Sequence, residues 1–291
     1  MPLPFLTQAK APLTCEVSAV NEFGEHISVS IPAERALTVY VDKRELVTLM
    51  TLGAHPELLV LGYLRNQRLV NSIQEIESIT VDWDVGAAAV KTRHGIADIE
   101  EKTSRRVVTT GCGQGSVFGG LMDEVDLIKL PPDASITQSQ LYALVNTIRL
   151  KETTYKSAGS VHACALFGSK NSIGNEPEML IFVEDVGRHN AIDTIAGWMS
   201  MQAEPRDEAN GIFYTTGRLT SEMVIKSAQM GVPIVVSRSG ITQMGHQVAQ
   251  AVGLCAIGRA TNKRFVCYTS TQRLVHEPGL AGIKPEVVKS A

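Results

Sequence analysis

The feature that most constrains the fold is an alternation of short apolar runs with helix-length amphipathic segments in the second half of the chain. Apolar runs at residues 179–183, 212–215 and 234–236 are each followed by a polar loop and then by apolar residues at helical spacing. Two further apolar runs, at 254–257 and 264–268, close the pattern. Strands alternating with helices in this way predict an α/β fold with a mixed, largely parallel sheet and helices on its faces.

The first half of the chain shows mainly the period-two alternation of strands. The expected strands are 15–19, 26–31, 36–41, 78–83 and 87–92, of which the last two form a hairpin. One helix interrupts them at Pro56, a residue suited to a first helical position. We therefore expect a smaller β-rich N-terminal region, 1–130, that ends in a cysteine loop, and an α/β domain, 131–291.

Polar residues mark where the later helices are expected to begin. Thr137 and Gln140 form a capping-box pattern before a helix that ends near Lys151. Asn190, Thr220 and Thr242 are expected to cap three further helices. An apolar run at 161–167 between these helices predicts a buried strand, with His162 hydrogen-bonded near the site and Cys164 in the core.

The amino-acid composition argues against several kinds of binding partner and site. The formal net charge is −3, so no basic field predicts a nucleic-acid partner. No apolar run is long enough to predict a membrane span, and the N-terminus lacks a signal-peptide pattern, so we expect a cytoplasmic protein. The five cysteines are odd in number and form no C-x-x-C, which argues against a disulfide framework and a cysteine-rich zinc site.

Three successive strand-to-helix loops each carry an arginine: Arg188, Arg218 and Arg238. Helix N-termini attract anions, and arginine binds phosphate oxygens in bidentate fashion, so these loops predict a phosphate or nucleotide site. The expected ligand contacts from these loops are Arg188, His189, Thr216, Gly217, Arg218, Ser237 and Arg238. A basic run containing Arg259, Lys263 and Arg264 is expected at the same sheet edge; the alternative is a solvated hairpin.

Cys112 lies in a loop with three glycines, Gly111, Gly113 and Gly115, which follows Arg105 and Arg106. An accessible thiol near arginines and free backbone N–H groups favours the thiolate, although a simple glycine turn is the alternative. The other cysteines do not lie in such a loop, so we expect them to be slow to form thiolates. They are Cys15, Cys164, Cys255 and Cys267.

Acidic residues near His189 do not make a convincing metal site. His189 and Asp193 share a helix face, but no third ligand has suitable spacing. We expect Glu184 and Asp185 to hold Arg188 and His189 in place. His55-Pro56-Glu57 matches the H-x-E of zinc deaminases, but the chain has no P-C-x-x-C, so we expect a solvated helix start and no intrinsic metal.

The segment Glu184–Asp193, with the sequence E-D-V-G-R-H-N-A-I-D, resembles the signature of the formate dehydrogenase accessory sulfurtransferases (FdhD). The similarity continues through Thr216-Gly217-Arg218, Ser221-Glu222-Met223, Lys226 and Gly231-Val232-Pro233-Ile234. The cysteine loop and residues 50–64 also resemble the family, so the match covers nearly the whole chain.

The resemblance implies a sulfurtransferase with a cytidine-deaminase-like, three-layer α/β/α core that lacks the deaminase zinc, and usually a homodimer. Cys112 would take sulfur as a persulfide from a cysteine desulfurase and pass it to the molybdenum of bis(molybdopterin guanine dinucleotide), which then enters formate dehydrogenase. GDP would mimic the bound cofactor. The family's cofactor-binding segment aligns with Arg259, Ala260, Thr261, Asn262, Lys263 and Arg264.

Two departures from the family pattern matter. The family loop commonly reads C-G-x-C-G, and here Gly115 replaces its second cysteine, so a relay between two loop thiols is not available. Arg259 also stands where an aromatic residue is usual. The alternative function is therefore a carrier for the molybdopterin guanine dinucleotide cofactor without sulfur transfer, and a zinc-free deaminase-like hydrolase is a third, less favoured, hypothesis.

Overall fold

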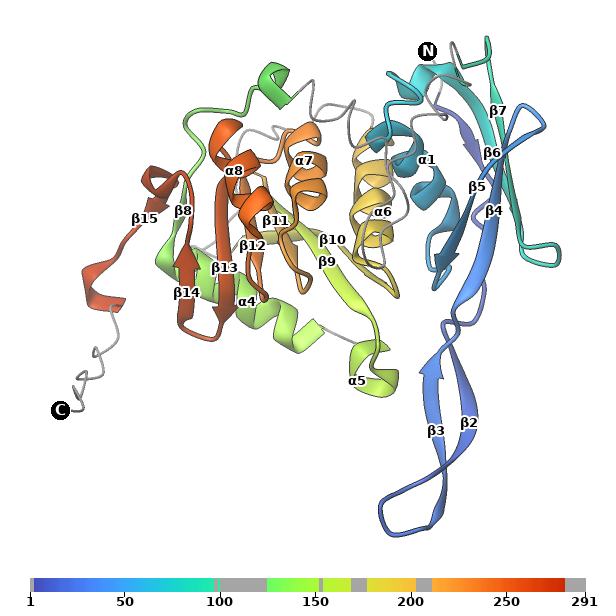
Figure 1. Cartoon of the computed structure of the whole chain (residues 1–291), viewed down its shortest axis with the longest axis horizontal. Coiled ribbons are helices and arrows are strands. Elements are labelled where there is room, and N and C mark those ends of the chain that lie inside the picture. The colour runs from blue at the N-terminus through green and yellow to red at the C-terminus, as the bar shows by residue number, and fades with distance from the viewer. Residues whose placement is uncertain are drawn as a thin grey trace.

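The protein contains two main β-sheets joined through a pair of packed helices (Figure 1). This computed structural model describes residues 3–96, 99, 125–151, 154–168, 177–202 and 211–280. A six-stranded sheet belongs to the second half of the chain and a five-stranded sheet to the first half. The division of the chain at residue 130 stays a prediction.

The six-stranded sheet has the order β10-β9-β11-β12-β13-β14. Its strands are β9 (His162–Gly168), β10 (Glu178–Asp185), β11 (Ile212–Thr215), β12 (Ile234–Ser237), β13 (Cys255–Thr261) and β14 (Arg264–Cys267). Only β11–β12 and β12–β13 pair in parallel, whereas β10–β9, β9–β11 and β13–β14 are antiparallel. The expectation of a largely parallel sheet was therefore wrong, because β9–β10 and β13–β14 are consecutive strands that pair without an intervening helix.

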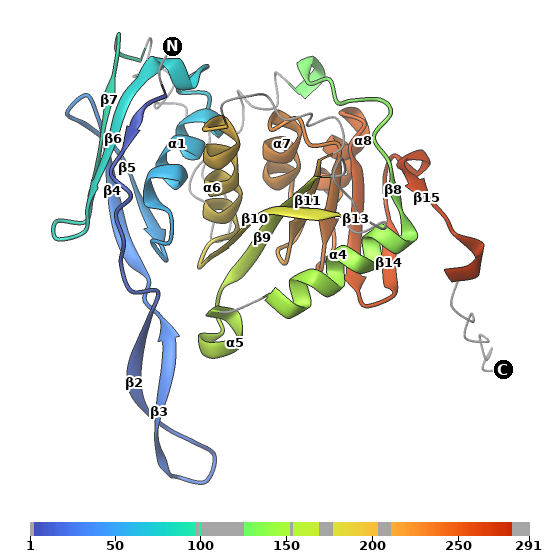
Figure 2. The ribbon, with the colours of Figure 1, turned by 180° about the vertical axis from the view of Figure 1, so that it is seen from behind.

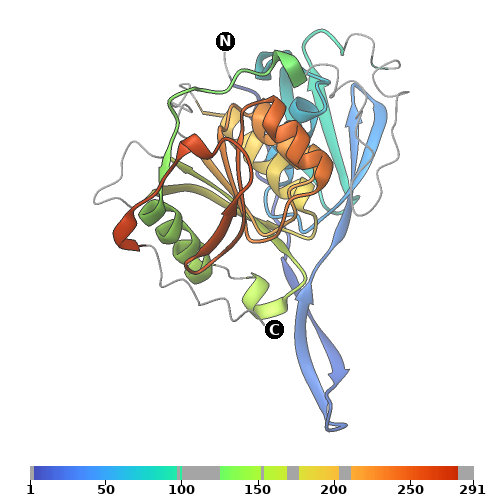
Figure 3. The same ribbon diagram turned by 60° about the vertical axis from the view of Figure 1, so that its left-hand side comes forward.

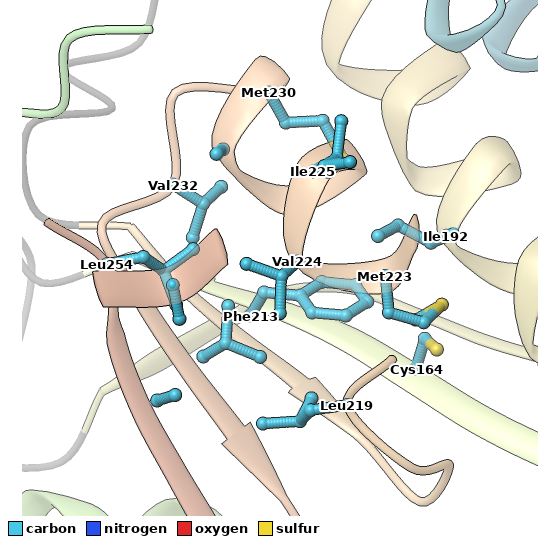
Figure 4. Packing of buried hydrophobic residues seen from close by; sticks show 14 of the residues in the cluster. Cys164, Ile192, Phe213, Leu219, Met223, Val224, Ile225, Met230, Val232 and Leu254 are labelled. Carbon is cyan, nitrogen blue, oxygen red and sulfur yellow. The ribbon is translucent and has the colours of Figure 1, made fainter. Parts of the chain in front are cut away.

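Helices cover both faces of this sheet, so its central strands β11 and β12 are buried on each side. One face carries α6 (Arg188–Ser200), α7 (Ser221–Gln229) and α8 (Gln243–Ala251), and the other carries α4 (Gln138–Lys151), which Figure 2 shows crossing the strands. Strand residues alternate between the two cores. Phe213 packs with Val224 and Met223 on the α7 face (Figure 4), while its neighbour Tyr214 joins the α4 face.

The helix starts confirm three of the four expected caps. Thr137 and Gln140 exchange the two hydrogen bonds of a capping box before α4. Thr220 and Thr242 occupy the N-cap positions of α7 and α8. The Thr242 side chain accepts from the Gly245 N–H, whereas the Thr220 side chain makes no capping hydrogen bond. The prediction for Asn190 was wrong, because α6 begins after Gly187 and Asn190 lies within the helix.

The five-stranded sheet has the order β1-β6-β7-β4-β5. Its strands are β1 (Phe5–Leu6), β4 (Arg35–Val41), β5 (Arg44–Thr51), β6 (Ile76–Asp82) and β7 (Ala87–Thr92). Helix α1 (Pro56–Asn66) packs on this sheet with Leu59, Val60 and Leu64 in the shared core. The expected β6–β7 hairpin is confirmed.

Helices α1 and α6 approach each other so closely that glycine is required at the contact. A Cβ on Gly62 would lie 1.6 Å from the Asp193 carbonyl oxygen, and one on Gly197 would lie 1.9 Å from the Leu58 carbonyl oxygen. Both distances are far below van der Waals contact, so neither position accepts a side chain. These two glycines let the two halves of the molecule share one helical layer.

A two-stranded arm projects from the body of the molecule (Figure 3). It consists of β2 (Thr14–Val20) and β3 (His26–Pro32), which pair with each other and with no other strand of the described residues. Because side chains alternate along a strand, one face of the arm is apolar. Its residues are Cys15, Val17, Ala19, Ile27, Val29 and Ile31.

Smaller elements complete the described chain. The short strands β8 (Ile136–Thr137) and β15 (Leu274–Val275) pair in parallel, and α5 (Thr154–Ala158) follows α4. Single 3-10 turns are η1 (Ile73–Glu75), η2 (Val125–Leu127), η5 (Thr271–Arg273) and η6 (Pro278–Leu280). Within the ranges given above, no helix is both long and apolar enough to cross a membrane.

Candidate functional site

The strand-to-helix loops that carry the predicted arginines lie side by side at one edge of the six-stranded sheet. The Thr216 N–H donates to the Ala163 carbonyl at 2.9 Å, and the Arg238 N–H donates to the Thr215 carbonyl at 3.0 Å. The Arg259 N–H continues this series by donating to the Ser239 carbonyl at 2.7 Å. We call this edge, with Arg188, Arg218, Arg238 and their loops, the arginine edge.

Side-chain hydrogen bonds fix the loops of the arginine edge from below. The Ser237 hydroxyl donates to the Gly217 carbonyl at 2.7 Å, and the Gly217 N–H donates to the Thr215 hydroxyl at 3.0 Å. A Cβ on Gly217 would lie 2.7 Å from Cδ of Arg188. Gly217 is therefore the position at which Arg188 packs across the loop, which explains why a residue without a side chain is found there.

His162 lies at the arginine edge because β9 runs antiparallel to β11. Its Nδ1 is 3.4 Å from the Thr216 hydroxyl. Partial burial lowers the pKa of His162, and the positive charges of Arg188 and Arg218 lower it further. The imidazole is therefore neutral at neutral pH, and the positive charge of the edge belongs to its arginines. The expected hydrogen-bonded strand position is confirmed.

His189 lies beneath the arginine edge rather than on it. The residue is only 3% exposed, and its Nδ1 is 3.5 Å from Glu222 Oε1. Burial, followed by the charges of Lys226 and Arg188, lowers the pKa of His189 to about 2. A neutral, enclosed imidazole positions the start of α6, so His189 belongs to the support of the site.

The Asp185 carboxylate joins the two halves of the molecule. It accepts from the Thr51 hydroxyl at 2.5 Å, the Leu52 N–H at 3.1 Å and the Gly187 N–H at 3.0 Å. Asn190 donates to the same carboxylate at 2.8 Å and to the Met50 carbonyl at 2.6 Å. Burial raises the pKa of Asp185, which these hydrogen bonds oppose. Asp185 therefore holds the loop before α6 in shape, as expected, but through the end of β5, Gly187 and Asn190 and not through Arg188 or His189.

A second set of buried polar contacts lies one helical turn further along α6. Lys226 Nζ is 2.9 Å from Asp193 Oδ2 and 3.5 Å from Glu222 Oε1, and Asn66 donates to Asp193 Oδ1 at 2.7 Å. Burial by itself lowers the pKa of Lys226, but the two carboxylates outweigh it and raise that pKa, so the lysine is charged. We call Asp185, Asn190, Asp193 and Lys226, with their partners, the interdomain seam.

The environments of Glu57 and Glu184 also differ from those expected. Glu57, expected at a solvated helix start, is 4% exposed and accepts at 2.7 Å from both the Thr7 hydroxyl and the Ala9 N–H. The N-terminal segment folds back over α1 and covers it, a long-range contact that the local pattern did not indicate. Glu184 accepts from the N–H groups of Thr154 and Tyr155, at 2.8 and 3.1 Å.

A cavity of about 500 Å³ adjoins the arginine edge on the α4 side of the sheet. Four predicted ligand residues line it: Arg238, Ala260, Thr261 and Asn262. Sequence reasoning missed the residues that α4 and α5 add, namely Arg149, Tyr155 and Lys156, together with Tyr214 from β11. The basic last turn of α4 was the available signal. The volume is typical of a small-molecule site, and its charged lining suits an anionic ligand.

The remaining predicted residues lie around this cavity. Lys263 and Asn262 line an adjacent groove of about 350 Å³ with Tyr142 and Arg149. Arg259, Lys263 and Arg264 are exposed, at or beside the β13–β14 hairpin turn. Arg188, Thr216, Gly217, Arg218 and Ser237 lie along the arginine edge and do not line the cavity. The structure therefore divides one predicted site into a cavity and a charged rim.

Comparison with known proteins decides the family. The model of the FdhD/NarQ family matches residues 32–275. The chain belongs to the FdhD/NarQ family. Sulfur carrier protein FdhD of Bacillus subtilis is 30% identical over 248 residues, covering 83% of this chain and 88% of that protein. Sulfur carrier protein FdhD of Listeria monocytogenes is 27% identical over 252 residues, covering 86% and 93%.

A solved structure shows the same fold as this family member. The crystal structure of a proposed formate dehydrogenase accessory protein from Desulfotalea psychrophila superposes with a TM-score of 0.70 at 20% identity. The alignment covers 91% of this chain and 100% of that one. The mixed α/β architecture with two sheets is therefore a fold already seen in a solved structure.

The predicted catalytic Cys112 lies outside the described residues, as do Arg105, Arg106 and the loop glycines. The described chain resumes with η2, Ile128 and Lys129. These last two residues line a cavity of about 490 Å³ with Asn66, Ser200 and Gln229, at the C-terminal ends of α1, α6 and α7. Since α7 begins at the arginine edge, the chain that follows Cys112 resumes at the opposite edge of the sheet.

Proposed function

We propose that this protein carries sulfur as a persulfide on Cys112, received from a cysteine desulfurase, and transfers it to the molybdenum of bis(molybdopterin guanine dinucleotide). The cofactor is the substrate of this step and then enters formate dehydrogenase. The names of the relatives, sulfur carrier proteins and a formate dehydrogenase accessory protein, support this direction. In the transfer, the S–S bond would break with its electron pair remaining on the Cys112 thiolate, and the outer sulfur would take the electrons of its new bond from the molybdenum of the substrate.

The observation that carries the proposal is the cavity beside the arginine edge. A guanine nucleotide has an anionic diphosphate and a flat base, and the cavity offers both kinds of contact. Arg149, Lys156 and Arg238 supply positive charge, and the rings of Tyr155 and Tyr214 supply flat apolar surface. The N-termini of α7 and α8 follow the loops of Arg218 and Arg238 and add favourable dipoles.

The cytidine-deaminase-like description of the core belongs to the same proposal. A central sheet with α6, α7 and α8 on one face and α4 on the other is the three-layer arrangement expected for that core. We infer that the family uses it without the deaminase zinc. Asp185 and Asp193 make hydrogen bonds and an ion pair with other protein groups, and His189 is an enclosed, neutral imidazole, which is the role of structural residues.

The arm supports the inference that the protein acts as a homodimer. Its apolar face carries Val17, Ile27 and Ile31, which are 36, 38 and 39% exposed. The opposite face is polar, with a hydrogen bond from Ser28 to Glu16 at 2.9 Å. A two-stranded ribbon is marginally stable alone, and an uncharged apolar face matches a second copy of itself across a two-fold axis.

The deciding experiment separates sulfur transfer from simple cofactor carriage. We expect incubation with a cysteine desulfurase and cysteine to add one sulfur to Cys112, detected by peptide mass spectrometry. A variant in which the other four cysteines are replaced should still accept sulfur and activate formate dehydrogenase, whereas Cys112→Ala should do neither. If Cys112→Ala still activates the dehydrogenase, the carrier function without sulfur transfer, which Gly115 makes the second candidate, is the better one.

A further inference from the structure

Two thiols meet between the last two strands of the six-stranded sheet, away from the arginine edge. Cys255 Sγ and Cys267 Sγ are 3.7 Å apart. In the antiparallel β13–β14 pair, Cys267 stands opposite Ile257, so Cys255, two residues earlier, projects from the same face of the sheet. Both side chains pack on the α4 side, and the cysteines are free.

The two thiols differ in accessibility. Cys255 is completely buried, whereas Cys267 is partly exposed and its sulfur also lies 3.6 Å from the Thr269 carbonyl oxygen. A reagent from solvent therefore reaches Cys267 first, and Cys255 stands directly behind it. This is the arrangement of an attacking thiol with a resolving partner.

The contact between the thiols also favours the thiolate on the accessible one. The two sulfurs lie within hydrogen-bond distance, and either thiol can be the donor; the interaction with Cys255 lowers the pKa of Cys267 although burial opposes the effect. The same hydrogen bond, with burial, raises the pKa of Cys255. This contact opposes the expectation that Cys267 is slow to form a thiolate. Its neighbours in sequence do not reveal it, because the partner is supplied by the adjacent strand.

We propose that Cys255 and Cys267 form a redox-active dithiol that a hydroperoxide oxidises to a disulfide between β13 and β14. The Cys267 thiolate attacks the peroxide, so that an S–O bond forms, the O–O bond breaks and the departing oxygen leaves after protonation as water, or as an alcohol when the hydroperoxide is organic. The Cys255 sulfur then loses its proton and attacks Cys267, forming the S–S bond and releasing the second oxygen as water. The two thiols lose two electrons and two protons in total, and a dithiol reductant reverses the reaction.

The bond would link the two strands that lead into the hairpin carrying residues 259–264. Among the described strands, β14 is the last of the sheet and pairs only with β13, and the register between them shifts between Gly258 and Thr261. A covalent link at the other end of this ladder would restrain the edge strand. In a reducing compartment such a disulfide is transient, which suits a sensing role rather than a structural one.

The test uses the full chain with Cys15→Ser and Cys112→Ser, which removes the other accessible or loop thiols. After treatment with hydrogen peroxide and then unfolding in denaturant, which exposes the buried thiols, two of the three remaining thiols should no longer react with a maleimide. Peptide mass spectrometry should show residues 255 and 267 cross-linked, with the mass lowered by two hydrogens, and a dithiol reductant should restore both thiols. The same experiment measures Cys164, which is buried with its pKa raised to about 12 and is the internal control.

Single variants then test the order of attack. In Cys255→Ala, peroxide should leave a sulfenic acid on Cys267 that dimedone traps, and in Cys267→Ser the oxidation of Cys255 should slow at least tenfold. The proposal would be overturned if the 255–267 cross-link did not form in the protein that keeps both cysteines. Equal oxidation rates for Cys164 and Cys267 would overturn it as well. None of these measurements depends on sulfur transfer or cofactor binding, so their outcome is independent of the proposed function.

Discussion

The segment Glu184–Asp193 contributes residues both to the interdomain seam and to the arginine edge, and charged side chains have opposite roles in these two regions. In the seam, Asp193 and Lys226 are 0 and 1% exposed, and the lysine is held between two carboxylates. At the arginine edge, Arg218 and Arg238 are exposed. Buried charges must have partners, whereas exposed cations at helix N-termini are available to a ligand. The most distinctive sequence segment of this chain therefore serves mainly to join its two halves.

The contrast also explains why the site depends on the joint between the halves. The loop before α6 is held by Asp185 and Asn190, which bind β5 backbone groups of the first half. Arg188, the next residue after the cap, packs on Gly217 of the neighbouring loop. Changes in the seam should therefore act first on stability, and changes at the edge should act first on binding.

The largest effect is expected from breaking the seam. Lys226→Ala leaves Asp193 and Glu222 buried without their cation and should lower the free energy of unfolding by about 3–5 kcal/mol. Urea denaturation measures this loss. The matched control is Lys91→Ala, which removes an exposed ion pair with Glu77 at 2.7 Å and should cost less than about 1 kcal/mol. Equal losses for the two variants would contradict the distinction between seam and surface.

The next effect concerns ligand binding at the arginine edge. Arg238→Ala and Arg218→Ala should each weaken GDP binding by about 1.5–3 kcal/mol, since each removes a charge-assisted hydrogen bond to phosphate. Calorimetric titration measures the affinities. Neither change should alter the urea midpoint appreciably, and Lys91→Ala should bind GDP like the wild type. Unchanged GDP affinity in either arginine variant would remove that arginine from the proposed site.

The pH dependence of stability tests whether His189 is a buried, neutral residue that supports the site. Its pKa is about 2 in the folded protein against an ordinary value of 6.5, so below pH 6.5 the unfolded state binds a proton that the folded state does not. The contribution of His189 to the free energy of unfolding is therefore constant above pH 6.5. It decreases as the pH is lowered, by about 2 kcal/mol between pH 7 and pH 5.

The measurement is urea unfolding at both pH values in wild type, His189→Gln and His26→Gln. His189→Gln should remove this part of the pH dependence, whatever its effect at pH 7. His26 lies exposed on the arm, so its replacement should keep the wild-type dependence. A wild-type slope that persists in His189→Gln would show that His189 is not the titrating group.

The smallest effect on folding is expected in the arm. Val17→Glu and Ile27→Glu place charges on its exposed apolar face and should change the unfolding free energy of the monomer by no more than about 0.5 kcal/mol. They should weaken self-association at least about tenfold, because each charge meets its own copy near the two-fold axis. Light scattering over a range of concentrations measures the change. Ser18→Glu, on the polar face, is the control and should leave association unchanged.

The sequence by itself determined most of the local structure. Apolar periodicity placed most of the longer strands and helices but missed β5, and it also missed the short elements β1, β8, β15 and α5. Thr137 with Gln140 fixed the start of α4. The strand–loop–helix order was enough to bring Arg218 and Arg238 to one edge, because the carboxyl ends of parallel strands meet there. Each of these features depends on residues that are near one another in the chain.

The tertiary structure alone decided the features that depend on distant segments. It paired β9 antiparallel with β11, buried Glu57 under the N-terminal segment and turned Asn190 from an expected cap into a contact with β5. It also brought Tyr155 and Lys156 to the cavity and Cys255 to Cys267. Local periodicity shows which face of an element is apolar, but the element that covers this face is chosen by long-range packing, which no local pattern records.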